Sequence, residues 1–209
     1  RVPFQADVGV YRALRPAEGW RLLAEDCIQA HATTGRYIAL HARVELEIMG
    51  HPCGREMERN LTKIVERVFD LHKTLTDTTG VSGLFIAVSR AGVHDTSIQQ
   101  SAYNRFRSIA DENMRTLDLL TNRSSEQQLF DQQLPVFECG ELALQDFYPS
   151  HPDVPDHGSL LESVINFHIA VSADVFVGVK GSSYSTDVLT TRYWLGKGKH
   201  NYRYTKEGI

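Results

Sequence analysis

The sequence predicts an α/β fold of the Rossmann-like, doubly wound type, in which helices cover both faces of a parallel sheet. Three short apolar runs, at 37–40, 84–88 and 174–179, have the continuous hydrophobicity of strands that are buried on both sides. Helical patterns separate these runs along the chain. Strands that alternate with helices form right-handed β-α-β crossovers, and therefore a parallel sheet.

Amphipathic patterns define the helices between the strands. The strongest is 61–72, where apolar side chains recur at i, i+3, i+4, i+7, i+8 and i+11. Ser159 and Glu162 form a capping-box pattern at the start of another helix, whose apolar stripe leads into the run at 174–179. The other expected elements are helices at 16–31 and 95–109, a strand at 117–120 and a final strand within 197–206.

Length and composition are those of a globular protein. The chain has 209 residues, enough for one large domain or two small ones, and we expect a single Rossmann-like domain over 1–209. Hydrophobic residues make up 42% and charged residues 23%, and the formal net charge of −4 argues against general nucleic-acid binding. No apolar run approaches the roughly 18 residues of a membrane span, and no signal peptide is recognised.

Three further features concern processing and compartment. The chain starts with Arg1 instead of methionine, as a piece of a longer protein would. The three cysteines have no metal-binding spacing and permit one intramolecular disulfide. Asn60 and Asn122 begin glycosylation sequons, which favour a secretory lumen.

A turn rich in glycine and serine at 180–185 follows the third apolar run and leads into a helical pattern. Such a turn gathers free main-chain N–H groups at the positive end of the helix dipole, which suits a phosphate. Ser182, Ser183 and Ser185 would add hydroxyl donors, and Arg192, about two turns later, would add a cation. The alternative is an ordinary helix cap, because serine is a preferred N-cap residue.

A second polar segment follows the run at 37–40, where the carboxyl end of a strand would meet a ligand. His41 and Arg43 are two residues apart in extended chain, so their side chains point to the same side. Arg43 can grip a diphosphate with two donors and offset negative charge on a leaving group. The alternative is an ion pair of Arg43 with Glu45 or Glu47 at the rim of the sheet.

These two segments resemble motifs of the GDP-fucose O-fucosyltransferase family, in particular of its plant and algal branch. Residues 40–49, LHARVELEIM, with Cys53 shortly after, resemble the family's His-x-Arg-φ-Glu segment. Residues 172–178 and 181–185, with Arg192, resemble its closing motif, in which a Ser-Asp-x-Phe strand leads through a small polar turn into a helix with an arginine. The resemblance spans most of the chain, and these two motifs are its distinctive parts.

The resemblance implies both an architecture and an activity. Family members have two Rossmann-like halves, the glycosyltransferase B architecture, and transfer fucose from GDP-fucose to a hydroxyl of a protein or glycan. The transfer inverts the configuration of the sugar and needs no metal. This chain resembles the C-terminal half, which binds GDP-fucose, so the N-terminal acceptor half would have to be supplied separately. The family also implies the lumen of the endoplasmic reticulum or Golgi.

The resemblance also assigns roles to individual residues. Arg43 would be catalytic, contacting the diphosphate and the bridging oxygen as GDP departs. Ser182 and Ser183 would bind the β-phosphate through main-chain and hydroxyl groups. The other matched positions, which would help to hold the nucleotide sugar, are His41, Tyr184 and Arg192.

The chain departs from the family pattern at several positions. Ala42 stands where a bulky aliphatic residue is usual, and Glu47 stands where aspartate is frequent. Asn166 occupies the place of a common aspartate; it can hydrogen-bond guanine but cannot accept both the N1–H and N2–H donors. Two hypotheses follow: a fucosyltransferase-like enzyme, and a non-catalytic Rossmann-like binding or assembly subunit of a larger complex.

Overall fold

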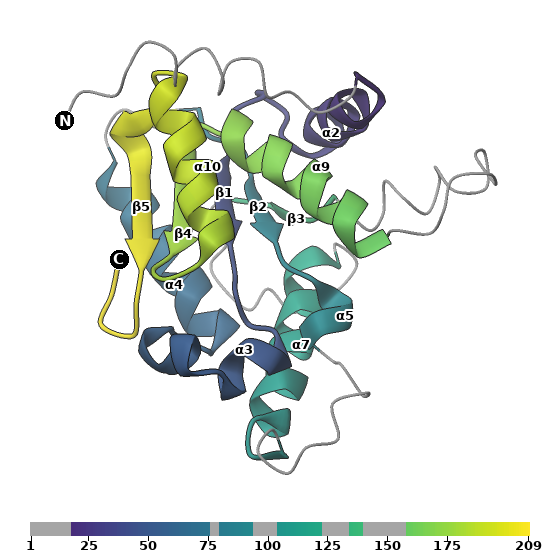
Figure 1. The fold of residues 1–209 in the computed structure, drawn as a ribbon. Helices are drawn as coiled ribbons and strands as arrows, with labels where there is room; N and C mark the ends of the chain where they lie inside the picture. The colour runs from purple at the N-terminus through teal and green to yellow at the C-terminus, as the bar shows by residue number, and fades with distance from the viewer. Residues whose placement is uncertain (1–17, 76–79, 94–103, 123–133, 140–157) are drawn as a thin grey trace.

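The computed structural model of the chain describes residues 18–75, 80–93, 104–122, 134–139 and 158–209 (Figure 1). These residues form a five-stranded, all-parallel sheet with helices on both faces, which confirms the predicted Rossmann-like α/β class. The strand order is β3-β2-β1-β4-β5. The strands are β1 (Ile38–His41), β2 (Leu84–Ala87), β3 (Val136–Phe137), β4 (Val175–Val179) and β5 (Asn201–Tyr204).

The central strand of the sheet is β1, and its position explains the apolar run that predicts it. Ile38 pairs with Leu84 of β2 and with Val175 of β4, and every residue of these three strands is buried. The chain builds outward from β1 through β2 to β3, and then adds β4 and β5 on the other side of β1. The direction of strand addition therefore reverses between β1 and β4, which is the topological switch point of the fold.

Two layers of helices bury the two faces of the sheet (Figure 1). On one face, the apolar stripes of α4 (Leu61–Thr74) and α7 (Arg107–Thr121) pack on the sheet, and α4 confirms the helix predicted at 61–72. The other face is covered by α2 (Glu18–His31), α9 (Gly158–Ser172) and α10 (Ser183–Trp194). Among the helices in the described ranges, none combines the length and apolar character needed to cross a membrane.

The remaining helical elements are short and lie in the loops. They are α3 (Leu46–Gly50), the 3-10 turn η1 (Pro52–Glu56), α5 (Arg90–Val93) and the 3-10 turn η2 (Gly198–His200). Both α3 and α5 follow strands at the carboxyl edge of the sheet, so they flank the place where a ligand is expected.

A disulfide links Cys27 of α2 to Cys139, which follows β3; their Cα atoms are 5.9 Å apart. The two cysteines are separated by 112 residues, so the bond closes a long loop. A cross-link of this kind typically stabilises a fold by about 2–4 kcal/mol, chiefly by restricting the unfolded chain. It is an example of the single bridge that the cysteine count permits.

The strand predicted at 117–120 is wrong. These residues form the last turns of α7, where Leu117 and Leu120 are buried and Asp118 is exposed. The segment Leu-Asp-Leu-Leu is rich in leucine, which fits a helix face as well as a strand, and here the helix continues through it. The third strand is instead β3, which has only two residues. Most of the helix predicted at 95–109 lies outside the described residues.

Candidate functional site

A cavity of about 440 Å³ lies at the carboxyl end of the sheet, beside the switch point. Its lining residues lie at the ends of β1 and β2, in the loops that follow them, in α9 and in the first turn of α10. Its lining residues are His41, Arg43, Glu45, Ala87, Val88, Ser89, Leu160, Glu162, Ser163, Asn166 and Tyr184. Four of the predicted binding residues, two from each half of the sequence, therefore meet in one cavity.

The segment that follows β1, residues 42–45, continues the extended backbone of the strand. The N–H of Ala42 donates to the carbonyl of Ala87 at 3.0 Å, and the N–H of Arg43 donates to the hydroxyl of Tyr204 at 3.0 Å. Side chains alternate along extended chain. Ala42 and Val44 are therefore fully buried, while His41, Arg43 and Glu45 line the cavity. The predicted common direction of His41 and Arg43 is confirmed.

His41 is held as a neutral ring with one nitrogen engaged. Ser185 accepts the N–H of Val179 at 3.0 Å, which leaves its hydroxyl proton for Nδ1 of His41, 2.7 Å away. In that arrangement Nε2 carries the proton of the neutral imidazole and is the donor available to a ligand. Burial, reinforced by the charge of Arg43, lowers the pKa of His41 to about 3. The ring therefore stays uncharged near neutral pH.

The contact between Ser185 and His41 is structural rather than nucleophilic. The Ser185 side chain is fully buried, and its oxygen already bonds the main chain of β4. A Cβ on Gly178 would lie 2.8 Å from the Ser185 oxygen, so glycine at this position lets α10 approach the strand. Since a nucleophile must reach substrate, Ser185 serves instead to fix the orientation of His41.

Arg43 and Glu45 form an ion pair along the cavity wall. Nε of Arg43 lies 3.5 Å from Oε2 of Glu45, and the side chains are 33% and 19% exposed. Burial raises the pKa of the Glu45 carboxyl, and the charge of Arg43 opposes that shift. The ion pair anticipated as an alternative is therefore present, with Glu45 and not with the exposed Glu47. Both partners also line the cavity.

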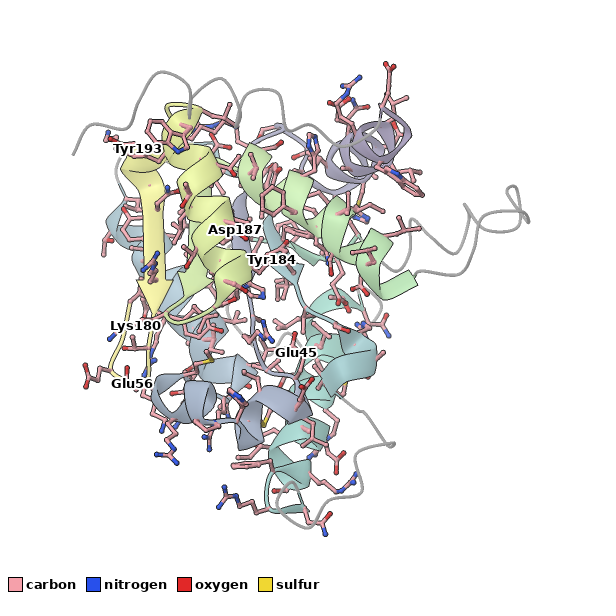
Figure 2. The ribbon with its side chains drawn as sticks, in the orientation of Figure 1. Glu45, Glu56, Lys180, Tyr184, Asp187 and Tyr193 are labelled. Carbon is pink, nitrogen blue, oxygen red and sulfur yellow. A yellow bond between two sulfur atoms is a disulfide. The ribbon has the colours of Figure 1, made fainter. Side chains whose placement is uncertain are left out.

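The opposite wall comes from α9 and α10. Asn166, on α9, is 7% exposed, and Tyr184, on the first turn of α10, stacks at a tilt on the His41 ring with centroids 4.5 Å apart. Leu160 is 62% exposed at the mouth of the cavity. In the view of Figure 2, Tyr184 lies above Glu45, at the end of the sheet. The cavity thus combines these polar groups with apolar surface from Ala87, Val88 and Leu160.

Buried polar atoms that lack hydrogen bonds concentrate around this cavity. Within the described part of the chain, four buried side-chain atoms of the cavity lining make no hydrogen bond, and two of these face each other in the ion pair of Arg43 with Glu45. Those four are Nε of Arg43, Oε2 of Glu45, Oδ1 of Asn166 and the hydroxyl of Tyr184. A buried polar group without a partner costs about 1–3 kcal/mol, so such a concentration is typical of a ligand site.

The two predicted phosphate-binding serines lie at the start of α10, outside the cavity lining. Ser182 is buried, and its side chain accepts the N–H of Ser185 at 3.3 Å; the N-cap alternative thus describes its hydroxyl correctly. Ser183 is exposed. The main-chain N–H groups of Ser183 and Tyr184 donate to no acceptor among the described residues. The N-terminus of α10 therefore retains two free donors.

Arg192 is not part of the cavity, which corrects its predicted role in nucleotide-sugar binding. It lies near the end of α10, at the amino edge of the sheet, and its side chain is fully buried. Its guanidinium donates to the carbonyls of Ala170, Val171, Ala173, Asp174 and Lys197 and to the side chain of Asn201. The position that matches the family arginine closes the end of α9 here.

Several lining residues were not predicted, although signals for some of them exist in the sequence. Ser89 directly follows the apolar run at 84–88, where the carboxyl-end rule points. Glu162 and Ser163 precede Asn166 by four and three residues, which puts all three on one face of α9. Glu45 was expected as an ion-pair partner of Arg43, not as a residue that lines the site.

The fold and the cavity define the class of the protein: a Rossmann-like α/β domain with a ligand-sized site at its switch point. Comparisons with protein-family models, with curated proteins and with solved structures found no match for the chain. In the described ranges, no three His, Cys, Asp or Glu side chains are grouped to hold a metal ion. Further assignment therefore depends on the chemistry of the cavity.

Proposed function

We propose that this chain binds a nucleoside diphosphate sugar, GDP-fucose by its motif resemblance, and acts as the donor-binding part of an inverting O-fucosyltransferase. The observation that supports this most strongly is the convergence of Arg43, His41, Asn166 and Tyr184 on one cavity at the switch point. These residues come from segments 120 or more residues apart in the sequence. Three of them, Arg43, Asn166 and Tyr184, have a buried polar atom that makes no hydrogen bond among the described residues and that a polar ligand could satisfy.

In this proposal the diphosphate lies between Arg43 and the start of α10. The guanidinium supplies the cation, and the N–H groups of Ser183 and Tyr184 lie at the positive end of a 12-residue helix. The ion pair of Arg43 with Glu45 spans 3.5 Å, longer than a good hydrogen bond, so a phosphate can compete for the guanidinium.

The nucleoside and sugar would meet the remaining polar groups. Oδ1 of Asn166 can accept one N–H of guanine, and the Nε2–H of neutral His41 can donate to a phosphate or sugar oxygen. During transfer, an acceptor hydroxyl would form a bond to the anomeric carbon as the bond to the β-phosphate breaks. Arg43 would stabilise the negative charge that GDP gains. The proton of the acceptor would pass to a base on the acceptor half, which the family resemblance places in a second domain.

A non-catalytic binding or assembly role is the second candidate, and specific observations favour it. The Ser182 hydroxyl caps a helix, the Arg192 guanidinium closes the end of α9, and Arg43 already has a carboxylate beside it. A protein that had lost its substrate would retain these structural contacts. The two candidates differ in whether a nucleotide binds at all.

The compartment proposed from the resemblance has independent support in the disulfide between Cys27 and Cys139. Such bonds persist in oxidising compartments and are rare where thiols are kept reduced. A secretory lumen, where O-fucosylation of the resembling family takes place, is therefore our proposal for the location.

Thermal denaturation with GDP, UDP and ADP tests the function directly. A ligand present at about 100 times its dissociation constant raises the free energy of unfolding by roughly 2.7 kcal/mol. We expect GDP, and not the other two nucleotides, to raise the melting temperature. Arg43→Ala should abolish the shift, because it removes the cation that faces the diphosphate.

Arg115→Ala is the matched control, because Arg115 is exposed on α7 and its Nε contacts only the Asp111 carbonyl among its described neighbours. It should retain the full response to GDP. If the unmodified chain melts at the same temperature with each nucleotide, the assembly role stands and the transferase proposal fails.

A further inference from the structure

The side chain of Glu45 is arranged as a wall of the cavity and not as a helix cap. Glu45 is the residue that precedes α3, yet its side chain makes no capping hydrogen bond to the helix. It turns into the cavity, where it is 19% exposed. Its Oε2 is buried and makes no hydrogen bond among the described residues, with Nε of Arg43 3.5 Å away. Burying a carboxylate oxygen in this way is unfavourable unless a donor reaches it.

A neighbouring glycine makes room for this arrangement. A Cβ built on Gly92, in α5, would lie 2.9 Å from Cγ of Glu45 and 3.4 Å from its Cβ. Any larger residue at 92 would therefore push the carboxylate out of its place. The absence of a side chain at this position lets α5 pack closely while Glu45 keeps its direction into the cavity.

The polar groups of the cavity are suited to a ligand that carries hydrogen-bond donors as well as a negatively charged group. Oδ1 of Asn166, a residue only 7% exposed, accepts no hydrogen bond among the described residues, and Oε2 of Glu45 has only the Arg43 guanidinium, 3.5 Å away, beside it. A phosphate group has only acceptor oxygens near neutral pH, so it would satisfy Arg43 but neither of these atoms. The donors must come from hydroxyl or N–H groups elsewhere in the ligand.

Glu45 lies directly beside Arg43: Oε2 of Glu45 and Nε of Arg43 are 3.5 Å apart. If Arg43 holds the diphosphate, the group beside Glu45 is the one attached to that diphosphate. In a nucleotide sugar the diphosphate joins the ribose to the sugar ring, and both groups carry hydroxyl donors. The proposed function assigns the nucleoside to Asn166, so the sugar ring is the group left to meet Glu45. This step rests on the proposed function.

We propose that Glu45 determines specificity for the sugar of the donor, by accepting a hydrogen bond from a hydroxyl of the ring attached to the diphosphate. A carboxylate acceptor forms a stronger hydrogen bond than a neutral one, so it distinguishes a glycosylated diphosphate from the bare nucleotide. Without the sugar, the negative charge of Glu45 faces the phosphates and weakens their binding. Glu45 therefore favours GDP-fucose and disfavours GDP.

The test is isothermal titration of the full chain with GDP and with GDP-fucose, comparing the unmodified protein with Glu45→Gln. We expect Glu45→Gln to bind GDP-fucose about tenfold more weakly, the loss expected for one charge-assisted hydrogen bond. The same variant should bind GDP as tightly as the unmodified protein or more tightly. Glu47→Gln, in the same segment but exposed, should bind both ligands normally.

Gly92→Ala is a second variant that keeps the carboxylate but displaces it. It should reproduce the loss for GDP-fucose while GDP binding is retained. An equal loss for both ligands in Glu45→Gln would overturn the proposal, because Glu45 would then act only by orienting Arg43. Unchanged binding of both ligands would overturn it too. If the unmodified chain binds neither ligand, the proposed function itself fails and this inference fails with it.

Discussion

Each end of the parallel sheet places an arginine among polar groups, but the two ends differ in how far those groups are satisfied by hydrogen bonds. At the amino end, Arg192 is fully buried and its guanidinium donates to six acceptors. At the carboxyl end, Arg43 has one carboxylate 3.5 Å away, and its Nε has no hydrogen bond among the described residues. The first arrangement is closed, and the second is open to a ligand.

The other groups at the amino end are satisfied in the same way. Arg36 donates to Asp174 at 3.0 Å, the other oxygen of Asp174 accepts the N–H of Tyr37, and the Tyr37 hydroxyl donates to the carbonyl of Ile169. This network ties the starts of β1 and β4 to the end of α9. Burial lowers the pKa of Arg192 to about 10, which still leaves it charged at neutral pH.

The comparison shows that charge and burial alone do not mark a binding residue. Arg192 is more deeply buried than Arg43, yet its contacts stabilise the fold. What separates the two ends is the supply of protein acceptors and donors. Substitutions that affect stability at one end and binding at the other test whether this distinction holds.

The largest effect is expected from Arg192→Leu. The variant would leave five carbonyls and the Asn201 side chain without their donor, in a site that excludes water. Since each buried unsatisfied group costs about 1–3 kcal/mol and some of them will relax, we expect a loss of about 3 kcal/mol or more. Urea denaturation followed by circular dichroism measures this loss.

Arg43→Ala provides the contrast at the other end. Its unfolding midpoint should move little, because its ion pair with Glu45 is partly exposed and such pairs contribute about 0–1 kcal/mol. If Arg192→Leu unfolded at the same urea concentration as the unmodified protein, the closed network would not be the stabilising feature that the contacts indicate. The comparison between the two ends would then fail.

A second, smaller effect concerns pH. His41 has a pKa of about 3 in the folded chain, against roughly 6.5 when unfolded, so the unfolded state binds one more proton between these values. The contribution of His41 to the free energy of unfolding is complete above its unfolded-state pKa. It is lost as the pH falls toward its folded-state pKa. Between pH 7 and pH 5 the expected loss is about 2 kcal/mol.

The measurement is the free energy of unfolding of the unmodified protein and of His41→Asn at several pH values. His72 and His168 also have lowered pKa values through burial, but both remain in the variant, so the difference between the two proteins isolates His41. The two curves should converge as pH falls. Parallel curves would mean that His41 is open to water and protonates freely.

Much of the fold could be predicted because buried elements produce recognisable patterns of apolar residues in the sequence. The central strands β1, β2 and β4 are buried on both faces and read as apolar runs, and the stripe of α4 repeats with the helical period. The strand β3 could not be predicted, because two residues show no period. The leucine-rich segment 117–120 resembles a strand when it is taken alone, whereas in the structure it is the end of α7, which begins ten residues earlier at Arg107.

The site was predictable in part. The rule that ligands bind beyond the carboxyl ends of parallel strands located His41 and Arg43, whereas Asn166 was expected only from the family resemblance. The role of Arg192 could not be predicted, because most of its partners are main-chain carbonyls about twenty residues upstream. Main-chain groups are present at every residue and leave no signature in a sequence.

The smallest effect is expected from Ser182→Ala. This variant tests whether a binding residue is better recognised by its position at the carboxyl end of the sheet or by its lack of hydrogen-bond partners in the protein. Ser182 lies at the carboxyl end, beside the proposed phosphate site, yet its hydroxyl is buried and accepts the Ser185 N–H. Loss of an N-cap costs about 1 kcal/mol, which urea denaturation resolves, whereas Ser183→Ala, at an exposed position, should cost less than half as much. Affinity for GDP should change little in Ser182→Ala, because the main-chain donors of the turn remain. A large loss of GDP affinity without a loss of stability would show that the Ser182 hydroxyl leaves its cap to bind phosphate, and that a satisfied group at this end of the sheet can still serve the ligand.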